Sequence, residues 1–407
     1  MRRCDNVGMH DLVIRGGKVV DGTGAAPVTA DVAIDGDQVV AVGQVDQAGT
    51  REIEADGALV TPGWVDVHTH YDGQATWDPV MRPSIDHGVT TAVMGNCGVG
   101  FAPVRPGGEA FLIELMEAIE DIPGTALHEG IDWRWETFGE YIDALAEMPR
   151  TLDLGTTVPH AAVRAYVLGD RCHEYDVDAA EIGEIARVMA DGVRDGALGV
   201  STSRTIQHRS RHGYEPGTFA LDEELMAIAD ELAGVGRGLF QFVSDKTYAQ
   251  AEWEWLDHLQ SKGVNVTYTL AQDPGAPEAY LANMDANHAA TLAGTPTAPQ
   301  VPTRPTGLLY GLQSTLHPFR AHPSYREIAD RPHAERLAAM RDPEFRARLL
   351  AEESKTKDRF IWYLVNNFAQ MYRLDDPADY EPPKEQGAAA VAEREGRTPQ
   401  EVIYDWL

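Results

Sequence analysis

Cysteine is scarce in this chain of 407 residues, which contains only Cys4, Cys97 and Cys172. Three scattered cysteines cannot build a disulfide framework, and this excludes the small secreted scaffolds that depend on one. The scarcity instead favours a reducing compartment, and we expect a cytoplasmic protein.

Positive charge is also in short supply. Lysine and arginine total 34 against 64 aspartates and glutamates, which gives a formal net charge of −30. An acidic surface gains nothing from a phosphate backbone or an anionic membrane, so the composition predicts neither nucleic acid nor membrane as a partner. A local basic pocket can still bind an anionic small molecule, and we expect a small-molecule substrate. The oligomeric state stays open.

Long apolar runs are absent as well. No run approaches the roughly 20 residues needed to span a bilayer, and the first 13 residues contain two arginines but no apolar segment of the secretory type. Hydrophobic residues still make up 43% of the chain. That is enough to bury one large core with room for a smaller domain.

The first 62 residues have a β pattern. Apolar residues at 12–14 and 19–20 flank Gly16-Gly17, where we expect a turn, and runs at 32–34 and 39–42 flank Asp35-Gly36-Asp37, a strong hairpin signal. Thr61-Pro62-Gly63 then indicates a change of domain. We therefore predict an N-terminal β domain over residues 1–62.

From residue 63 strands and helices alternate. We expect buried strands at 64–67, 90–94, 152–158, 197–201, 239–243 and 264–270, with a possible seventh at 301–309. Apolar helix faces are expected at 111–119, 182–193 and 225–232. Repeated strand–helix units predict a parallel sheet with helices outside, either closed or doubly wound.

The strongest chemical motif is Val67-His68-Thr69-His70, which follows the first of these strands. Residues i and i+2 of a strand point to the same face, so the two imidazoles are expected side by side. Chance spacing is the alternative. At the carboxyl end of a barrel strand both would face the region where active sites lie, and imidazole suits zinc and similar ions.

Cys97 ends the next strand within Gly95-Asn96-Cys97-Gly98. A lone cysteine is usually a small buried apolar residue. Here the flanking glycines allow close backbone approach, and a cation would convert the thiol to a thiolate ligand. We expect the Cys97 sulfur within about 5 Å of the His68 and His70 nitrogens, as a shared ion demands.

Four segments together resemble the N-acyl-D-amino-acid deacylase branch of the amidohydrolase superfamily. They are LVIRGGKVVDGTG, VTPGWVDVHTHYDGQATWDP, HGVTTAVMGNCGVGFAPVRPG and GALGVSTSR, and the similarity runs from about residue 11 to the end. The resemblance implies an α/β fold, a (β/α)8 TIM-type barrel over residues 63–407 beside a small β-sandwich over residues 1–62. It also implies one or two zinc ions held by His68, His70 and Cys97.

The chain departs from that pattern on two strands. Histidines that the family uses for metal are missing from the fifth strand, LFQFVSD, and from the sixth, VTYTLAQ. Asp245 and Gln272 are possible oxygen-donor replacements. His208 and His212 in the following loop are also possible replacements, although loop histidines are more often simply solvated.

The family's catalytic aspartate belongs to an eighth strand of the Ser-Asp-Gly type, and no such motif occurs before Leu407. The capping box Thr398-Pro399-Gln400-Glu401 predicts a helix that then stops at Trp406-Leu407. We therefore expect that the barrel lacks its last strand, that the catalytic residue lies beyond Leu407, and that a 407-residue protein is poorly soluble or inactive.

Four residues are candidates for binding substrate. His160 begins a His-x-x-x-Arg segment after the third strand, and Ser201 and Arg204 end the fourth. Arg304, near the expected seventh strand, is the first choice for a fork onto a substrate carboxylate. A structural role for His160, a turn-capping role for Ser201 and a surface ion pair for Arg304 are the alternatives.

These features predict a metal-dependent hydrolase that deacylates N-acyl-D-amino acids. One rival is a cyclic-amide hydrolase of the dihydropyrimidinase type; such enzymes use a carbamylated lysine as the bridging ligand, and Cys97 argues against that. The other is a metal-binding protein of this family with impaired catalysis, which the missing histidines favour.

Overall fold

The computed structural model describes residues 8–245, 250–272, 276–295, 297–303, 307–314, 316–357 and 359–407. The chain divides into two compact units, one that ends at Val301 and one that spans Pro302–Leu407. The predicted boundary after residue 62 lies within the first unit, and the division after Val301 was not predicted.

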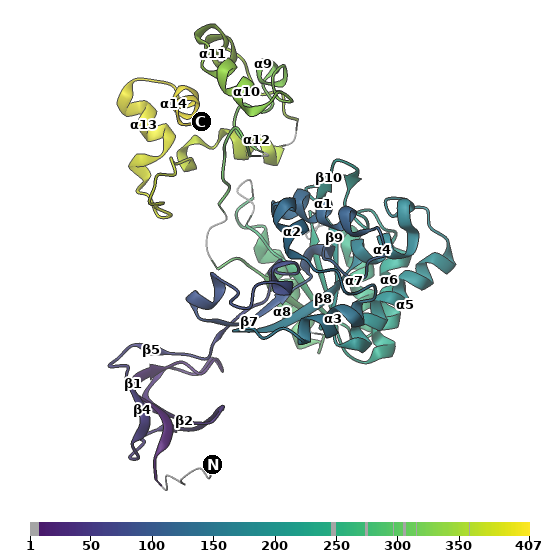
Figure 1. The fold of residues 1–407 in the computed structure, drawn as a ribbon, viewed down its shortest axis with the longest axis vertical. Coiled ribbons are helices and arrows are strands. Elements are labelled where there is room, and N and C mark those ends of the chain that lie inside the picture. Colours follow the sequence, from purple (N-terminus) through teal and green to yellow (C-terminus); the bar gives the residue numbers. More distant parts are fainter. Residues whose placement is uncertain are drawn as a thin grey trace. The chain divides into compact units, whose positions relative to one another are not determined.

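The first unit begins with a five-stranded sheet (Figure 1). Its strands are β1 (His10–Val19), β2 (Val28–Asp35), β3 (Gln38–Gly43), β4 (Gly49–Glu54) and β5 (Leu59–Val60). The order is β3-β2-β1-β4, and β5 also pairs with β1. The predicted hairpin is confirmed, because β2 and β3 are antiparallel and pair up to Asp35 and Gln38 on either side of the turn.

The turn predicted at Gly16-Gly17 is wrong. β1 continues through both glycines, and its register against β2 shifts between Ile14 and Gly17. Gly16 has a φ of 61°, a left-handed conformation that glycine adopts without strain. The glycines therefore form a β-bulge, which inserts an extra residue into a strand without reversing the chain.

A seven-stranded parallel sheet follows. Its strands are β6 (Trp64–Asp66), β7 (Val89–Met94), β8 (Asp153–Pro159), β9 (Gly199–Arg204), β12 (Leu239–Ser244), β13 (Asn265–Thr269) and β14 (Thr297–Gln300), each paired with the next. Six match predicted strands. The seventh, β14, ends before the predicted run at 301–309, because pairing to β13 uses residues 297–300.

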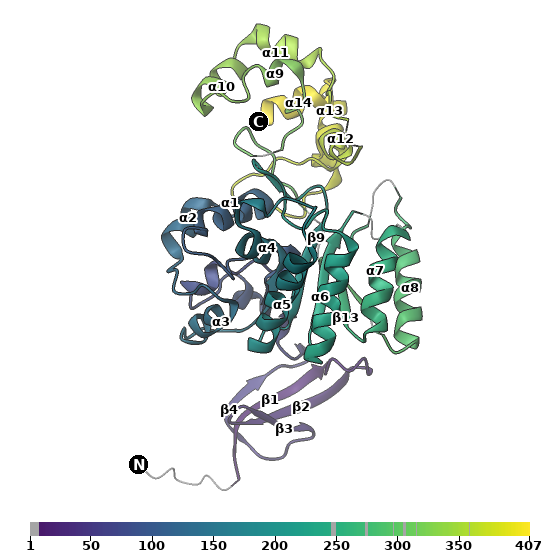
Figure 2. The same cartoon turned by 90° about the vertical axis from the view of Figure 1, so that its right-hand side faces the viewer.

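Helices cover the outer face of this sheet (Figure 2). They are α1 (Glu109–Glu120), α2 (Gly124–Gly130), α3 (Phe138–Ala146), α4 (His160–Leu168), α5 (Ala179–Asp195), α6 (Asp222–Val235), α7 (Gln250–Ser261) and α8 (Tyr280–Leu292). The three predicted helix faces are confirmed: α1, α5 and α6 bury Leu112, Ile185 and Ile228 in one core with strand residues such as Phe240.

The second unit is helical. It contains α9 (Pro323–Arg326), α10 (His333–Met340), α11 (Pro343–Leu350), α12 (Arg359–Asn366), α13 (Ala388–Glu395) and α14 (Pro399–Trp406). These helices enclose a core of their own, and the capping box predicted at Thr398 is present at α14. In the part of the chain described, no helix combines the length and apolar character needed to cross a membrane.

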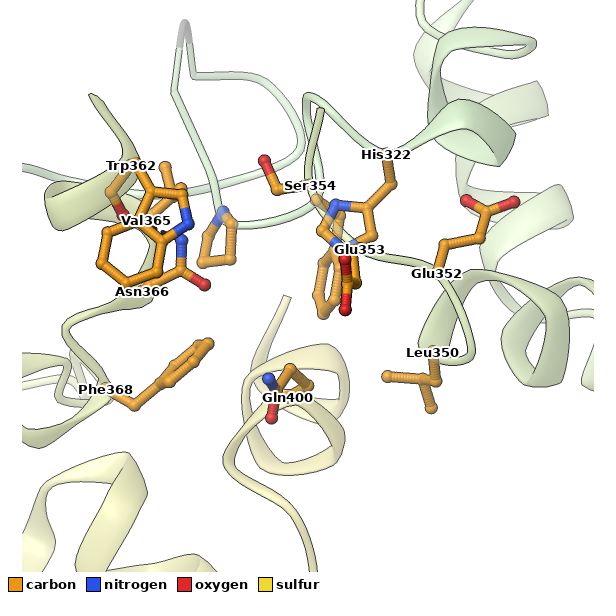
Figure 3. Close-up of a pocket in the computed structure, with 12 residues that line it drawn as sticks. His322, Leu350, Glu352, Glu353, Ser354, Trp362, Val365, Asn366, Phe368 and Gln400 are labelled. Carbon is orange, nitrogen blue, oxygen red and sulfur yellow. Dashed lines mark hydrogen bonds between the residues drawn. The ribbon is translucent and has the colours of Figure 1, made fainter. Parts of the chain in front are cut away.

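A cavity of about 350 Å³ lies within this helical unit. Figure 3 shows Trp362 and Asn366 of α12 on one side and His322 and Leu350 on the other. Glu352, which also lines it, accepts hydrogen bonds from the backbone N–H of Ser324 (2.9 Å) and from its hydroxyl (2.5 Å). That carboxylate is therefore committed to holding the start of α9.

Candidate metal centre

His68 and His70 follow the carboxyl end of β6. Between them, the Thr69 N–H donates to Val93 O of β7 at 2.9 Å, so the segment stays aligned with the sheet. The two rings lie with their centroids 5.4 Å apart. His68 Nδ1 is 2.7 Å from Gln300 Oε1 at the end of β14, and its Nε2 is 3.2 Å from Cys97 Sγ.

Cys97 lies in a single tight turn, Asn96–Gly98, after β7 and has a φ of 58°. Its N–H donates to Gln241 Oε1 of β12 at 2.9 Å, and the next N–H, that of Gly98, donates to Ser201 Oγ of β9 at 3.0 Å. A left-handed conformation is rare for a residue with a side chain and is typical of functional sites. These two neighbouring strands hold the thiol in place.

The glycines around Cys97 are required by space. A Cβ at Gly95 would lie 2.2 Å from Thr157 O, and one at Gly98 would lie 2.5 Å from Glu215 Oε1. Both also have a positive φ, 75° and 82°. The Gly-Asn-Cys-Gly motif is therefore the sequence that allows this turn to pack directly against β8 and Glu215.

The structure brings the three predicted ligands together. One donor atom each of His68, His70 and Cys97 lies within 4.8 Å of the other two. That separation is what a single ion with bonds of roughly 2.0–2.3 Å requires. His68 and His70 follow β6 and Cys97 follows β7. Because these two parallel strands are neighbours, the side chains beyond their carboxyl ends lie close together.

Two further residues complete the centre. Glu120, the last residue of α1, has its Oε1 3.3 Å from His70 Nε2. Cys97, Glu120 and His208 form a second group whose donor atoms lie within 4.8 Å of one another. Glu120 was not predicted from the sequence. A signal was present, because the helix macrodipole disfavours a carboxylate at the carboxyl end of a helix, and such a residue invites a functional explanation.

Burial controls the charges in the centre. It raises the pKa of Glu120 to about 7 and that of Asp72 to about 7, and it raises the pKa of the Cys97 thiol. Burial and then the charge of His68 lower the pKa of His70 to about 3, which keeps its imidazole neutral. Without a cation, negative charge is therefore costly here, and the imidazoles are in the form that binds metals.

Unpartnered atoms support the same interpretation. Among the described residues, His70 Nδ1, Asp72 Oδ2 and Glu215 Oε1 are buried polar atoms without a hydrogen-bond partner. Buried polar groups are ordinarily satisfied, and buried charges are paired or coordinate metals. The donor set of two imidazoles, a thiol and carboxylates fits zinc or a similar divalent ion.

His160 and Ser201, two of the residues predicted to bind substrate, are both fully buried. His160 Nδ1 is 2.8 Å from Thr202 Oγ1 and its Nε2 is 2.6 Å from Glu224 Oε1. The Ser201 hydroxyl donates to Gly95 O and accepts from Gly98 N–H. Both side chains thus support the strand ends, and neither has an exposed atom for a ligand.

Two arginines were predicted to bind substrate, and Arg204 is the one that lies within the described residues. Its Nη1 donates to Ala220 O at 2.9 Å and its Nη2 lies 3.8 Å from Asp222 Oδ1, with the side chain 13% exposed. Arg304, the first choice for the substrate carboxylate, lies outside the described residues.

Asp245 and Gln272, the possible oxygen-donor replacements, make hydrogen bonds elsewhere in the structure. Asp245 accepts from the Thr205 hydroxyl at 2.5 Å and from the Ile206 N–H at 2.7 Å, and this fixes the loop after β9. Gln272 donates to Pro277 O at 2.8 Å. Asp245 belongs to no group of His, Cys, Asp and Glu side chains that could hold an ion among the residues described. Of the loop histidines, His208 reaches the centre and His212 pairs with Glu114 at the surface.

A model of the amidohydrolase family matches residues 51–403, which include the whole centre. The chain belongs to the amidohydrolase family. An uncharacterised protein of Mycobacterium tuberculosis is 34% identical over 56% of this amidohydrolase and 39% of its own length. A D-aminoacylase of Alcaligenes xylosoxydans is 31% identical over 56% of this chain and 43% of its own.

A solved structure shares the fold of this amidohydrolase. It is the N-acyl-D-glutamate deacylase of Bordetella bronchiseptica, crystallised with zinc and a phosphonate inhibitor. Its TM-score is 0.59 at 26% identity, covering 77% of this chain and 61% of the other. The chain thus spans about two fifths of the length of these two curated relatives and three fifths of this solved structure.

Proposed function

We propose that this amidohydrolase is a metal-dependent hydrolase of linear amides that releases a carboxylic acid and a D-amino acid from an N-acyl-D-amino acid. The observation that carries the proposal is the convergence of His68, His70 and Cys97 donor atoms within 4.8 Å. The relatives named D-aminoacylase and N-acyl-D-glutamate deacylase support the choice of substrate class.

We further propose zinc as the ion, held by His68, His70 and Cys97. A bound ion of this kind polarises an amide carbonyl and makes hydroxide available near neutral pH. The protein's own contribution is to fix the donors: Gln300 orients the His68 ring through Nδ1, and Gln241 and Ser201 hold the turn that presents Cys97. Such outer partners usually set the tautomer and direction of the ligands.

Three finer features belong to the same proposal. The parallel sheet is part of a (β/α)8 barrel, the five-stranded sheet is part of a small β-sandwich, and the protein acts in the cytoplasm on a small-molecule substrate. Arg304 binds the substrate carboxylate, with Arg204 as the second choice. A bidentate guanidinium suits that group, even on a chain of net charge −30, because charges on the surface are screened beyond about 8 Å.

The test is hydrolysis of N-acetyl-D-amino acids by the purified full-length gene product, before and after chelation and after zinc is returned. We expect chelation to abolish release of the free amino acid, zinc to restore it, and the L-enantiomers to react far more slowly. His70→Asn should be inactive, whereas the surface variant His212→Asn should retain activity. A protein that binds zinc but hydrolyses no acylamino acid would instead support the rival, a metal-binding relative without catalysis.

A further inference from the structure

The cavity of the helical unit has walls that are mainly aromatic and aliphatic. Six of the residues that line it are apolar: Pro318, Phe319, Leu350, Trp362, Val365 and Phe368. Figure 3 shows Trp362 and Phe368 on the opposite side from Leu350. Its volume of about 350 Å³ lies within the range of small-molecule sites, roughly 300–1,000 Å³, which are usually apolar with a few polar groups.

Trp362 is the most exposed aromatic residue of this wall. Its side chain is 55% exposed, whereas Phe319 and Val365 in the same wall are 1% and 3% exposed. The residue is fixed on α12, since its backbone carbonyl accepts from Asn366 Nδ2 at 2.8 Å. An indole ring has the electron-rich face that binds cations best, so Trp362 offers an occupant of the cavity a cation–π contact.

The charge of the lining is negative. Glu352 and Glu353 line the cavity, and none of the described lining residues is a lysine or arginine. Burial alone would raise the pKa of Glu352, but hydrogen bonds from Ser324 outweigh it and lower the pKa, so this carboxylate stays ionised. Arg348 lies behind Ser324, with its Nε donating to the hydroxyl at 2.8 Å, and its Nη2 pairs with Glu327. The lining therefore favours a cation over an anion.

His322 adds a polar atom without adding positive charge. The residue is 7% exposed, and its Nδ1 is buried without a hydrogen-bond partner among the described residues. Burial lowers the pKa of His322, so the imidazole is neutral near pH 7 and does not repel a cation. Buried polar atoms ordinarily have a partner, and a neutral ring nitrogen can bond a polar group of a ligand.

We propose that this cavity is a binding site for a small organic ammonium ion, with Trp362 contacting the ammonium group and Glu353 supplying the opposite charge. Aromatic rings beside a carboxylate suit an alkylated ammonium, because its methyl groups pack on apolar walls while its charge interacts with the ring faces. Glu352 adds negative charge, although its oxygens already accept from Ser324. The site belongs to the helical unit alone and does not depend on the proposed function.

The experiment is calorimetric titration of the zinc-loaded full-length gene product with choline and with its uncharged isostere, in which carbon replaces the quaternary nitrogen. We expect one choline per chain and roughly tenfold weaker binding of the isostere, because it lacks the charge. Trp362→Leu and Glu353→Gln should each weaken choline binding by a similar factor. Equal binding of the two probes, or choline binding unchanged in both variants, would overturn the proposal.

Matched controls come from the surface of the same unit. Tyr380→Leu removes an aromatic ring that is 81% exposed, and Glu335→Gln removes an exposed carboxylate. Neither residue lines the cavity, so both variants should bind choline as the wild type does. Circular dichroism establishes folding, and if Trp362→Leu does not fold, Glu353→Gln and the comparison with the isostere still decide.

Two further measurements locate the ligand. Choline binding that is lost in His70→Asn but kept in Trp362→Leu would place it at the metal centre and overturn the proposal. Sedimentation with phosphatidylcholine vesicles distinguishes a lipid headgroup, which would carry the protein down unless Trp362 is replaced, from a free ion, which would leave it in solution. Choline binding as expected in a protein without deacylase activity would support the cavity site and contradict only the proposed function.

Discussion

At the scale of single residues, the arrangement of His68 and Cys97 depends on side chains outside the proposed ligand set. Gln300 is the clearest example, because its Oε1 lies 2.7 Å from His68 Nδ1 and fixes which nitrogen faces Cys97. No motif or spacing singles out this glutamine before the strands are paired. Its importance depends on pairing between β13 and β14, which brings the last residue of β14 beside a histidine more than 200 residues earlier.

We predict that Gln300→Leu lowers zinc affinity and deacylase activity by about 10–100-fold, the usual effect of losing an outer partner of a ligand. Competition with a chromogenic chelator measures the affinity. Gln272→Leu is the control, since Gln272 bonds Pro277 O and stands apart from the centre. Equal losses in both variants would contradict the assigned role of Gln300.

Arg304 gives the second prediction at this scale. Arg304→Ala should raise KM for acylamino acids far more than for the matching amides, because only the acids carry the carboxylate that a guanidinium forks onto. Steady-state kinetics on both substrate series measure this difference. Equal effects on acids and amides would mean that Arg304 is structural.

At the scale of elements, the alternation of apolar runs located strands and helices well, because burial on both faces of a parallel sheet leaves short, dense apolar segments. The same pattern gave wrong element boundaries where backbone geometry determines how strands turn and end. Gly16-Gly17 forms a bulge, and β14 ends before residue 301. Glu120 and His208 were missed or left undecided for a related reason: their partners are defined only once α1 and the loop after β9 pack together.

The turn at Cys97 gives a prediction about backbone and space. Gly95→Ala places a Cβ against Thr157 O, whereas Gly107→Ala, at a similar φ of 87°, meets nothing within 4 Å. Both variants carry the cost of a left-handed alanine, about 1–2 kcal/mol. We expect Gly95→Ala to lower the free energy of unfolding by clearly more than that, as measured by urea denaturation. Equal losses would mean that the close approach is relieved by a shift of the strand.

A buried network joins α4 to α6. Glu224 accepts from Arg164 Nη1 at 2.5 Å and contacts His160, and all three side chains are fully buried. Burial alone would raise the pKa of Glu224, but His160 and Arg164 outweigh it and lower the pKa to about 2. We predict that Glu224→Gln costs about 3–5 kcal/mol of stability, because it leaves the Arg164 charge buried and unpaired.

The lowered pKa also fixes a pH dependence. Glu224 binds its proton near pH 4.3 in the unfolded chain and only near pH 2 in the folded chain. The contribution of the ionised Glu224 to the free energy of unfolding is therefore complete above about pH 4.3 and is lost as the pH falls toward 2. It amounts to about 3 kcal/mol, at about 1.4 kcal/mol per pH unit. Glu224→Gln should remove this part of the acid dependence in urea unfolding followed between pH 2 and 5. An unchanged slope would contradict the assignment.

At the scale of the whole molecule, the two units have separate apolar cores, one around the parallel sheet and one among α9–α14. We therefore predict two transitions in thermal unfolding. Leu349→Ala, in the helical core, should lower the midpoint temperature of only one transition, and Ile185→Ala, beneath the sheet, that of only the other. Each variant should cost its own unit about 2–5 kcal/mol of unfolding free energy. Differential scanning calorimetry measures both. A single transition shifted by either variant would mean that the units unfold together.

The buried turn at Cys97 also has a consequence for the lifetime of the protein. Without a cation, burial keeps this sulfur as a neutral thiol that is only 6% exposed, and such a thiol reacts slowly with peroxide because the thiolate is the nucleophile. Gln241 and Ser201 hold the turn that buries it. Metal starvation followed by brief exposure to peroxide should therefore leave the protein able to bind zinc again, and irreversible loss of zinc binding would mean that the turn opens when no ion is bound.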